Sequence, residues 1–267
     1  MGKTIEISPF EIGRFSDQEI YDHVIEFHSR SNYSLFPGTA PRCYLSSAPD
    51  KALAEMIESE LSIWPGIKPS AQLTSARTAL LRDESAEFFD DASVLEFSVI
   101  DQLMTNSFCA RSSESRKRPY PSGGALYPIE VFVCRVSNNV DNWPTKENIL
   151  HLLPLSRHLE AMTIHAPDII LSNLSGGDTG LLGQPHFALV YAMFFERALF
   201  KYRTRGYRLA LMEAGSMYQT ADLNAQALGL RSRVWAGFTD FQVAKTIGID
   251  MRHMAPLVVQ FFGNANN

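Results

Sequence analysis

One long helical stretch, residues 206–228, constrains the fold of this 267-residue chain more than any other feature. Alanine, leucine and methionine dominate it, and Gly229 follows directly, where a glycine commonly ends a helix. Because the stretch is apolar on more than one face, we predict a helix in the centre of the protein or at an interface. One stripe at helical spacing consists of Leu209, Met212, Ser216, Gln219 and Leu223.

The remaining elements mix helices and strands in an irregular order, which predicts an α+β fold. Ser93 and Glu96 have capping-box spacing, so a helix should begin behind Ser93 and run to about Phe108. A change of composition near residue 70 divides the chain into a helical and loop extension, 1–70, and a main domain, 71–267. Periodicity and turn residues predict further helices over 17–30, 50–61 and 240–248, strands over 129–136, 187–195, 234–236 and 256–262, a weak strand and turn over 150–159, and loops over 32–49 and 172–183.

Composition excludes several classes of function. The net charge of −5 gives no positive field for nucleic acid or an anionic membrane surface. The N-terminus lacks the apolar region of a signal peptide, and the longest apolar run, 187–195, is too short to cross a bilayer, so we expect a soluble, cytoplasmic protein. Cys43, Cys109 and Cys134 have no dithiol or zinc spacing, and the histidines are dispersed, so no metal site is predicted. Redox chemistry would therefore need a bound organic cofactor.

A turn of small residues between a basic triplet and a strand is the first candidate site. Arg116, Lys117 and Arg118 precede Pro121, and the residues from Ser122 to Ala125 carry no bulky side chain. Such a turn lets backbone N–H groups approach a flat or anionic ligand closely. The planar fork of Arg118 could clamp a phosphate. A surface turn with a solvated basic run is the alternative.

The second candidate site, residues 199–208, holds four cations and two tyrosines between an apolar strand and the long helix. Apolar neighbours and nearby arginines both favour the neutral amine of Lys201, and the cations favour the phenolate of Tyr202. Either group could act as a general base. The alternative is a helical turn whose cations pair with Glu196, Glu213 or a partner chain, although basic residues at a helix N-terminus oppose its dipole.

A third segment, Val234–Asp240, is by itself only a junction between a strand and a helix. Together and in this order, however, the three segments resemble the nitroreductase superfamily, and most of all its SagB/McbC-type azoline dehydrogenases. PSGGALYPIEVFV is similar to their flavin-binding turn and strand. FKYRTRGYRLALMEAGSMYQTADLNAQALGL is similar to their Lys-Tyr site and central dimer helix, WAGFTD to the segment beside flavin N5, and LVVQFFG to the last core strand. The resemblance spans about residues 75–264.

The resemblance implies an α+β fold with an antiparallel-rich sheet flanked by helices, an N-terminal extension, and an interlocked homodimer with FMN at two shared sites. It implies Lys201 and Tyr202 as catalytic residues. We expect no basic C-terminal tail to bind the FMN phosphate. Arginines elsewhere in the chain, among them Arg77, Arg118 and Arg205, should therefore hold this phosphate. The other residues expected to bind FMN are Pro121, Ser122, Gly123, Gly124, Ala125, Leu126, Ala236, Gly237 and Phe238.

The function that the resemblance implies is oxidation of thiazoline and oxazoline rings to thiazoles and oxazoles in a ribosomally made precursor peptide. The chain would then be the dehydrogenase subunit of a microcin B-like synthetase, beside an ATP-dependent cyclodehydratase and leader-peptide-binding subunits. The fold alone does not establish this substrate. An NAD(P)H-dependent nitro or quinone reductase, or a flavin-bearing scaffold of the complex, remains an alternative.

Overall fold

The computed structural model describes residues 17–30, 82–90, 93–112 and 115–265. The predicted loop 32–49, the helix 50–61, the boundary near residue 70 and Arg77 lie outside these residues.

A seven-stranded sheet forms the centre of the fold, with strand order β1-β9-β7-β3-β5-β6 and with β8 paired to β9. Every neighbouring pair in it is antiparallel, which confirms the predicted antiparallel-rich α+β architecture. A short parallel pair, β2 (Leu95–Glu96) with β4 (Val140–Asp141), lies apart. The strands of the sheet are β1 (Phe89–Asp90), β3 (Ile129–Arg135), β5 (Ile149–Leu153), β6 (His158–Thr163), β7 (Phe187–Phe194), β8 (Arg231–Trp235) and β9 (Met254–Ala265).

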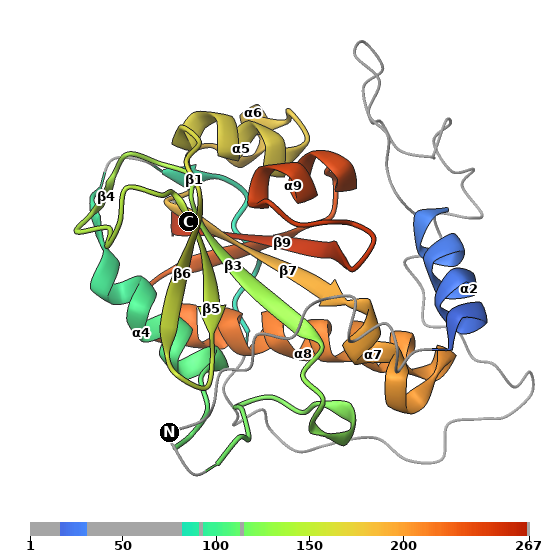
Figure 1. Ribbon diagram of the computed structural model, residues 1–267. Helices are drawn as coiled ribbons and strands as arrows, with labels where there is room; N and C mark the ends of the chain where they lie inside the picture. Colours follow the sequence, from blue (N-terminus) through green and yellow to red (C-terminus); the bar gives the residue numbers. More distant parts are fainter. Residues whose placement is uncertain (1–16, 31–81, 91–92, 113–114, 266–267) are drawn as a thin grey trace, which may run out of the picture. The chain divides into compact units, whose positions relative to one another are not determined.

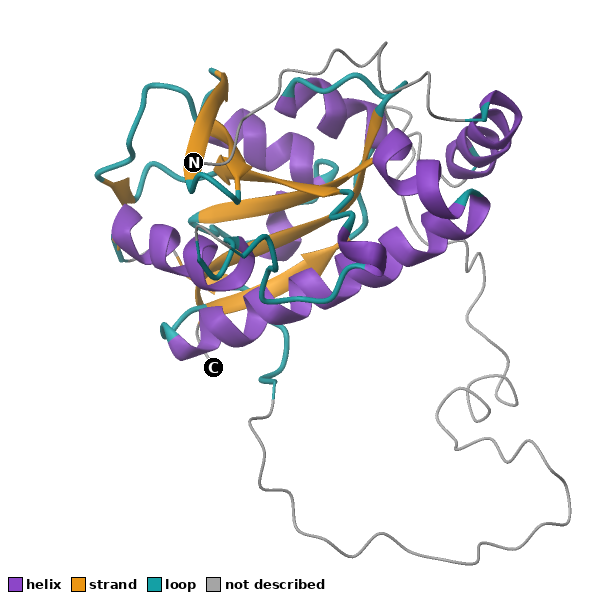
Figure 2. Cartoon of the chain, turned by 60° about the horizontal axis from the view of Figure 1, so that its bottom comes forward, coloured by secondary structure: helices purple, strands orange, loops and turns teal. Residues whose placement is uncertain are grey.

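Helices cover both faces of the sheet, as Figures 1 and 2 show. The long α8 (Thr204–Ala227) and α4 (Phe97–Phe108) pack on one face; α5 (Pro167–Ser175), α6 (Thr179–Leu182) and α9 (Asp240–Ile247) pack on the other. Side chains alternate between the two cores, so Val131 and Val133 of β3 face α8 whereas Phe132 and Cys134 face α5. Two further helices are α2 (Gln18–Ser29) and α7 (Phe195–Tyr202).

Several elements confirm their local sequence patterns. The N-terminal helix begins where predicted, and the Asp17 carboxylate accepts a hydrogen bond from the Glu19 N–H. Strands β3 and β7 and helices α8 and α9 occupy their predicted segments to within two residues. Strand β9 extends beyond the predicted 256–262 at both ends, and β8 begins at Arg231, three residues before its predicted start.

Other predictions are wrong. The capping box at Ser93 and Glu96 does not form, because Glu96 belongs to β2 and α4 starts only at Phe97. Ser93 instead bonds across the fold: its carbonyl accepts from His186 and its hydroxyl contacts the Asn264 amide. The predicted loop 172–183 contains the end of α5 and all of α6. The weak strand and turn predicted over 150–159 are present as β5 and the turn after Leu153, but no pattern predicted β6 as a strand. No pattern predicted α7, which follows β7 without a loop.

The long helix α8 turns its small residues toward the core, which allows it to lie close to the sheet. Ala210, Ala214 and Ala221 are buried, whereas Met212, in the stripe identified from the sequence, is 63% exposed. The neighbouring Leu211 is also exposed. The other four residues of the stripe are half-buried, so only Met212 among the five lies on the outer face of the helix.

Helices α7 and α8 approach so closely that only glycine fits at residue 206. A Cβ there would lie 1.9 Å from the Ala198 carbonyl oxygen, a backbone atom that cannot move aside. We expect Gly206→Ala to lower the free energy of unfolding by about 2 kcal/mol or more, in the range of overpacking. Gly215→Ala on the same helix is the matched control: its nearest neighbour would be 3.7 Å away. The control should gain about 0.5–1 kcal/mol from helix propensity. Urea unfolding measures both, and equal stability of the two variants would contradict the close approach.

Candidate functional site

The three candidate segments leave the sheet at the same end. Strand β3 begins at Ile129, which pairs with Met193 near the end of β7, and β9 begins at Met254 opposite Phe194. Strand β8 runs antiparallel to β9, so its last residue, Trp235, points toward the start of β9. The turn before β3, helix α7 after β7 and the junction after β8 therefore share one end of the sheet.

The turn before β3 has a strained backbone. Gly124 has φ 64°, and Ala125 and Tyr127 have φ 55° and 51°, in the left-handed region that side chains disfavour. The Ser122 hydroxyl accepts a hydrogen bond of 2.9 Å from the Tyr127 N–H and closes the turn. Strain of this kind persists only where surrounding contacts enforce it, and it is common at ligand sites.

Two arginines enforce this turn. Arg118 is buried, and its guanidinium lies 4.3 Å from the centre of the Tyr127 ring and donates to the Tyr120 hydroxyl. The backbone N–H of Arg118 donates to the Tyr127 hydroxyl. Arg197 of α7 donates to the Tyr127 carbonyl at 3.0 Å and to the Glu130 carboxylate at 2.6 Å. The guanidinium predicted to clamp phosphate is thus engaged in supporting the turn, which favours a structural role for Arg118.

Charged neighbours hold Arg197 in place. Burial alone would raise the pKa of Glu130, but hydrogen bonding to His151 and the Arg197 charge keep it below its usual value. Burial would lower the pKa of His151, yet Glu130 and Glu160 raise it. Both shifts favour the ionised pair, so the network anchors α7 to the start of β3.

The structure brings Lys201 and Tyr202 to the glycine turn. Both residues end α7, and the Lys201 amine lies 5.3 Å from the centre of the Tyr202 ring. A Cβ on Gly124 would lie 2.5 Å from the Tyr202 hydroxyl and 3.1 Å from the Lys201 Nζ. The two proton-transfer candidates therefore lie against bare, exposed backbone, and the absent Cβ leaves room for the Tyr202 hydroxyl and the Lys201 amine there.

Sequence reasoning missed one residue of this site, Glu213. It was considered only as an ion-pair partner, but the structure buries it beneath the turn at 3% exposure. Burial raises the pKa of its carboxyl to about 7, although Ser122, Arg118, the Ile129 N–H and Arg197 each act to lower it. The available signal was a lone acidic residue in the most apolar part of a helix.

The junction after β8 contributes less than expected. The Phe238 side chain is buried in the core beside α5 and α9, so it is not open to a ligand. The Gly237 carbonyl accepts a 3.0 Å bond from the Trp235 indole, and Ala236 is exposed. A ligand could meet the backbone here, but not the Phe238 ring. Arg205, in the first turn of α8, is exposed.

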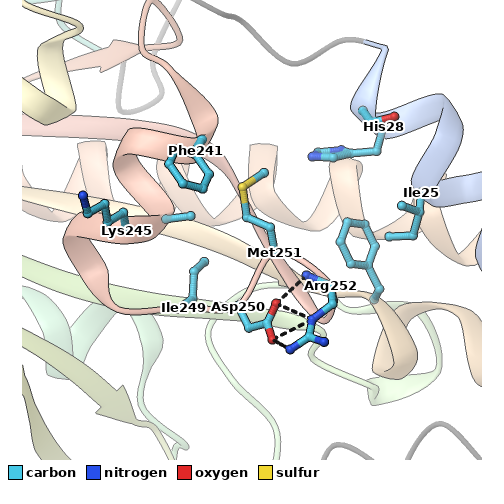
Figure 3. Close-up of a pocket in the computed structure, with 11 residues that line it drawn as sticks. Ile25, His28, Phe241, Lys245, Ile249, Asp250, Met251 and Arg252 are labelled. Atoms are coloured by element: carbon cyan, nitrogen blue, oxygen red, sulfur yellow. Dashed lines mark hydrogen bonds and ion pairs between the residues drawn. The ribbon is translucent and has the colours of Figure 1, made fainter.

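A large cavity lies away from these residues. It encloses about 490 Å³ between α2, α9 and the loop after α9, and Figure 3 shows the Asp250 carboxylate bonded to Arg252 at its edge. This volume suits a ligand pocket, but no predicted site residue lines it. Its lining residues are Ile25, His28, Ser29, Phe195, Phe241, Ala244, Lys245, Ile249, Asp250, Met251 and Arg252. We place the site at the turn, where the candidate chemistry converges.

The part of the chain that the structure describes contains no cluster of three or more His, Cys, Asp or Glu side chains able to hold a metal ion. None of its described helices is long and apolar enough to cross a bilayer.

Comparison with known proteins decides the family. Residues 84–263 match the Nitroreductase family. The chain belongs to the nitroreductase family. Its members are oxidoreductases that generally depend on a flavin, so this chain is an oxidoreductase of a flavin-dependent family. The predicted family and fold are thereby confirmed.

Two relatives extend over nearly the whole chain. The Microcin B17-processing protein McbC of Escherichia coli is 46% identical over 263 residues, covering 98% of this chain and 97% of the relative. A chain in the structure of the E. coli microcin synthetase McbBCD complex with truncated pro-MccB17 bound is 45% identical, with a TM-score of 0.88. That match covers 99% of this nitroreductase-family chain and 100% of the other.

A more distant structure shows the fold alone. It is a putative nitroreductase from Ralstonia eutropha, 17% identical, with a TM-score of 0.58 over 78% of this chain and 97% of its own. The nitroreductase fold is therefore shared widely, whereas the near-complete match at 45–46% identity is to proteins of microcin B17 synthesis.

Proposed function

We propose that this chain is an FMN-dependent azoline dehydrogenase that oxidises thiazoline and oxazoline rings of a precursor peptide to thiazoles and oxazoles. The observation that carries the proposal is the placement of Lys201 and Tyr202 against the bare backbone of Gly124. The near-complete match to the Microcin B17-processing protein McbC supports this substrate class. The match to a chain of the McbBCD synthetase complex supports work within a complex of this kind, in which a cyclodehydratase and leader-peptide-binding subunits would be the partners of this chain.

The residues at the turn suit a flavin. The 123–126 backbone would meet the ring, and Arg205, with Arg77, would hold the phosphate. The cavity behind the turn is only about 10 Å³, far below the ~300 Å³ of a small ligand pocket, so the ring would lie on the open side of Gly124. A second copy packed on the exposed apolar side chains of α8, Leu211 and Met212, would complete a homodimer.

Oxidation of each ring removes two protons and two electrons. Lys201 or Tyr202 would take the proton from the ring carbon next to the carbonyl, which makes this proton acidic. The bound flavin supplies the acceptor for the hydride from the adjacent carbon. The chain's own contribution is to hold the ring in place and to position the base.

We expect the purified protein to be yellow and to release FMN, not FAD. The turn at Gly123 and Gly124 leads into a strand, β3, whereas a dinucleotide fold has a glycine turn that opens a helix. Absorbance and chromatography of the released cofactor measure this. A protein that stays colourless after reconstitution with FMN would contradict the proposal.

The decisive assay combines the chain with its cyclodehydratase partners and weighs the peptide product. We expect each ring to lose two hydrogens. Rapid flavin bleaching by NADPH with no change in peptide mass would favour a nitro or quinone reductase instead. Full oxidation of the peptide by a Lys201→Ala, Tyr202→Ala double variant would show that Lys201 and Tyr202 are not the bases. If that oxidation also did not depend on flavin bound to this chain, a scaffold role would be favoured.

A further inference from the structure

Glu213 carries a buried carboxyl that the proposed mechanism does not use. It lies on the core face of α8, and its Oε1 has no hydrogen-bond partner among the described residues. A buried acceptor without a partner is costly, so a residue of this kind calls for a functional explanation.

The groups around Glu213 leave it able to gain or lose a proton near neutral pH. Arg118 and Arg197 supply positive charge, and the Ser122 hydroxyl and the Ile129 N–H face the carboxyl. Tyr120 is also close, since the Glu213 charge helps to raise the pKa of its phenol. Burial outweighs these contacts and places the pKa of Glu213 at about 7.

A small cavity is lined by both Glu213 and Tyr202. It encloses about 10 Å³, close to the minimum volume that holds one water molecule. Among its nine lining residues, Tyr202 and Glu213 have the only polar side chains. A buried water needs two or more polar partners, and these two groups supply them. The other lining residues are Gly123, Leu126, Pro128, Ala198, Gly206, Leu209 and Ala210.

We propose that Glu213 is the inner end of a proton path that begins at Tyr202, with one water in this cavity as the link. The proposal rests on the proposed function. As the ring C–H bond breaks, the Tyr202 oxygen takes up that proton and passes its own to the water. The water in turn gives one to the Glu213 carboxylate, and a carboxyl O–H bond forms. The electron pair of the broken C–H bond stays in the ring and forms the new C=C bond. The hydride from the adjacent carbon carries away the pair of its own C–H bond, which a bound flavin would accept, so charge and atoms balance.

The first test needs no turnover. Infrared spectroscopy follows the C=O stretch of a protonated carboxyl as pH is varied, and Glu213→Gln identifies the band. We expect a titration near pH 7 in the wild type and a shifted midpoint in Tyr202→Phe. A Glu213 band that titrates identically in the wild type and in Tyr202→Phe would overturn the path.

Thermal unfolding checks the same titration independently. The folded pKa of about 7 is above the ordinary 4.5, so both states are protonated below pH 4.5. Between pH 4.5 and 7 the unfolded chain ionises first, and the wild type loses stability as pH rises. Glu213→Gln removes this loss, so its Tm relative to the wild type should rise across that window and then level off. A constant difference would contradict the assignment.

The second test measures oxidation. The path needs ionised Glu213, so the turnover rate of the wild type should rise with pH through about pH 7. The pH-rate profile of Glu213→Gln should lack this rise. We expect turnover to fall about ten- to a hundredfold, less than the 10² to 10⁴ typical of a direct base, with the flavin retained and KM unchanged. Glu213→Asp should restore part of the rate. Unchanged turnover and pH profile in Glu213→Gln would overturn the proposal.

Asp222→Asn is the matched control. Asp222 is another buried carboxylate of α8, but it contacts Ser232 and pairs with Arg82, not with the turn. Loss of the Asp222 carboxylate should lower Tm without changing the rise in turnover rate near pH 7. If the wild type itself makes no azoles, the proposed function fails, whereas the infrared titration still decides whether Glu213 and Tyr202 are coupled.

Discussion

A Gly124→Val protein should be colourless and inactive. The new Cβ would lie 2.5 Å from the Tyr202 hydroxyl and 3.1 Å from the Lys201 amine, and a branched side chain would fill the space beside them. The backbone at φ 64° adds strain that β-branched residues tolerate poorly. Both effects displace the Lys-Tyr pair and distort the turn on whose open side we place the flavin ring, so we expect complete loss of the cofactor, a larger loss than Arg205→Ala causes. Absorbance per protein measures occupancy.

Gly177→Val is the control for strain alone. Gly177 also has a left-handed backbone, with φ 88°, but a Cβ there meets nothing within 4 Å. It should lose some stability and keep its flavin. Gly123→Val should have an intermediate effect, because its φ is ordinary and its Cβ meets the flexible side chain of Leu209 at 3.0 Å. Normal occupancy in Gly124→Val would move the flavin away from this turn.

Lys201→Ala and Tyr202→Phe should each leave the flavin bound and stop the peptide at azolines. Loss of a general base typically lowers the rate by about 10² to 10⁴, enough to separate ring closure from ring oxidation. Both groups lie at one glycine and would serve the same proton transfer, so the double variant should be little worse than the poorer single variant. With the cyclodehydratase present, stalled rings are two hydrogens heavier than azoles, and acid should reopen them.

Lys245→Ala is the matched lysine control, since Lys245 is an exposed residue of α9 that lines the large cavity and not the turn. It should oxidise the peptide at the wild-type rate. If the Lys201 and Tyr202 variants did so too, the base would lie elsewhere, and Tyr127 and Tyr207 would be the next candidates. Both hydroxyls already have partners in the structure, Arg118 and His28, which makes them weaker candidates.

The sequence alone determined the features that depend on residues close to one another in the chain. Helix α8 and strands β3 and β7 follow from periodicity over a single segment, and the candidate residues of the turn and of the Lys-Tyr pair could be named from their composition. The resemblance to the nitroreductase superfamily used the same short segments, and the family match over residues 84–263 confirms it.

Tertiary structure alone decided the features that depend on contacts between distant segments. The distance of Lys201 and Tyr202 from Gly124 follows from the pairing of β3 with β7, which no local pattern encodes. Pairing of Leu95 with Val140 overrode the capping box at Ser93, since a strand pair competes with a helical start for the same backbone groups. Burial beneath the turn is a property of the packed fold and not of the residue. It encloses the Arg118 guanidinium and raises the pKa of Glu213, and neither sequence position indicated this.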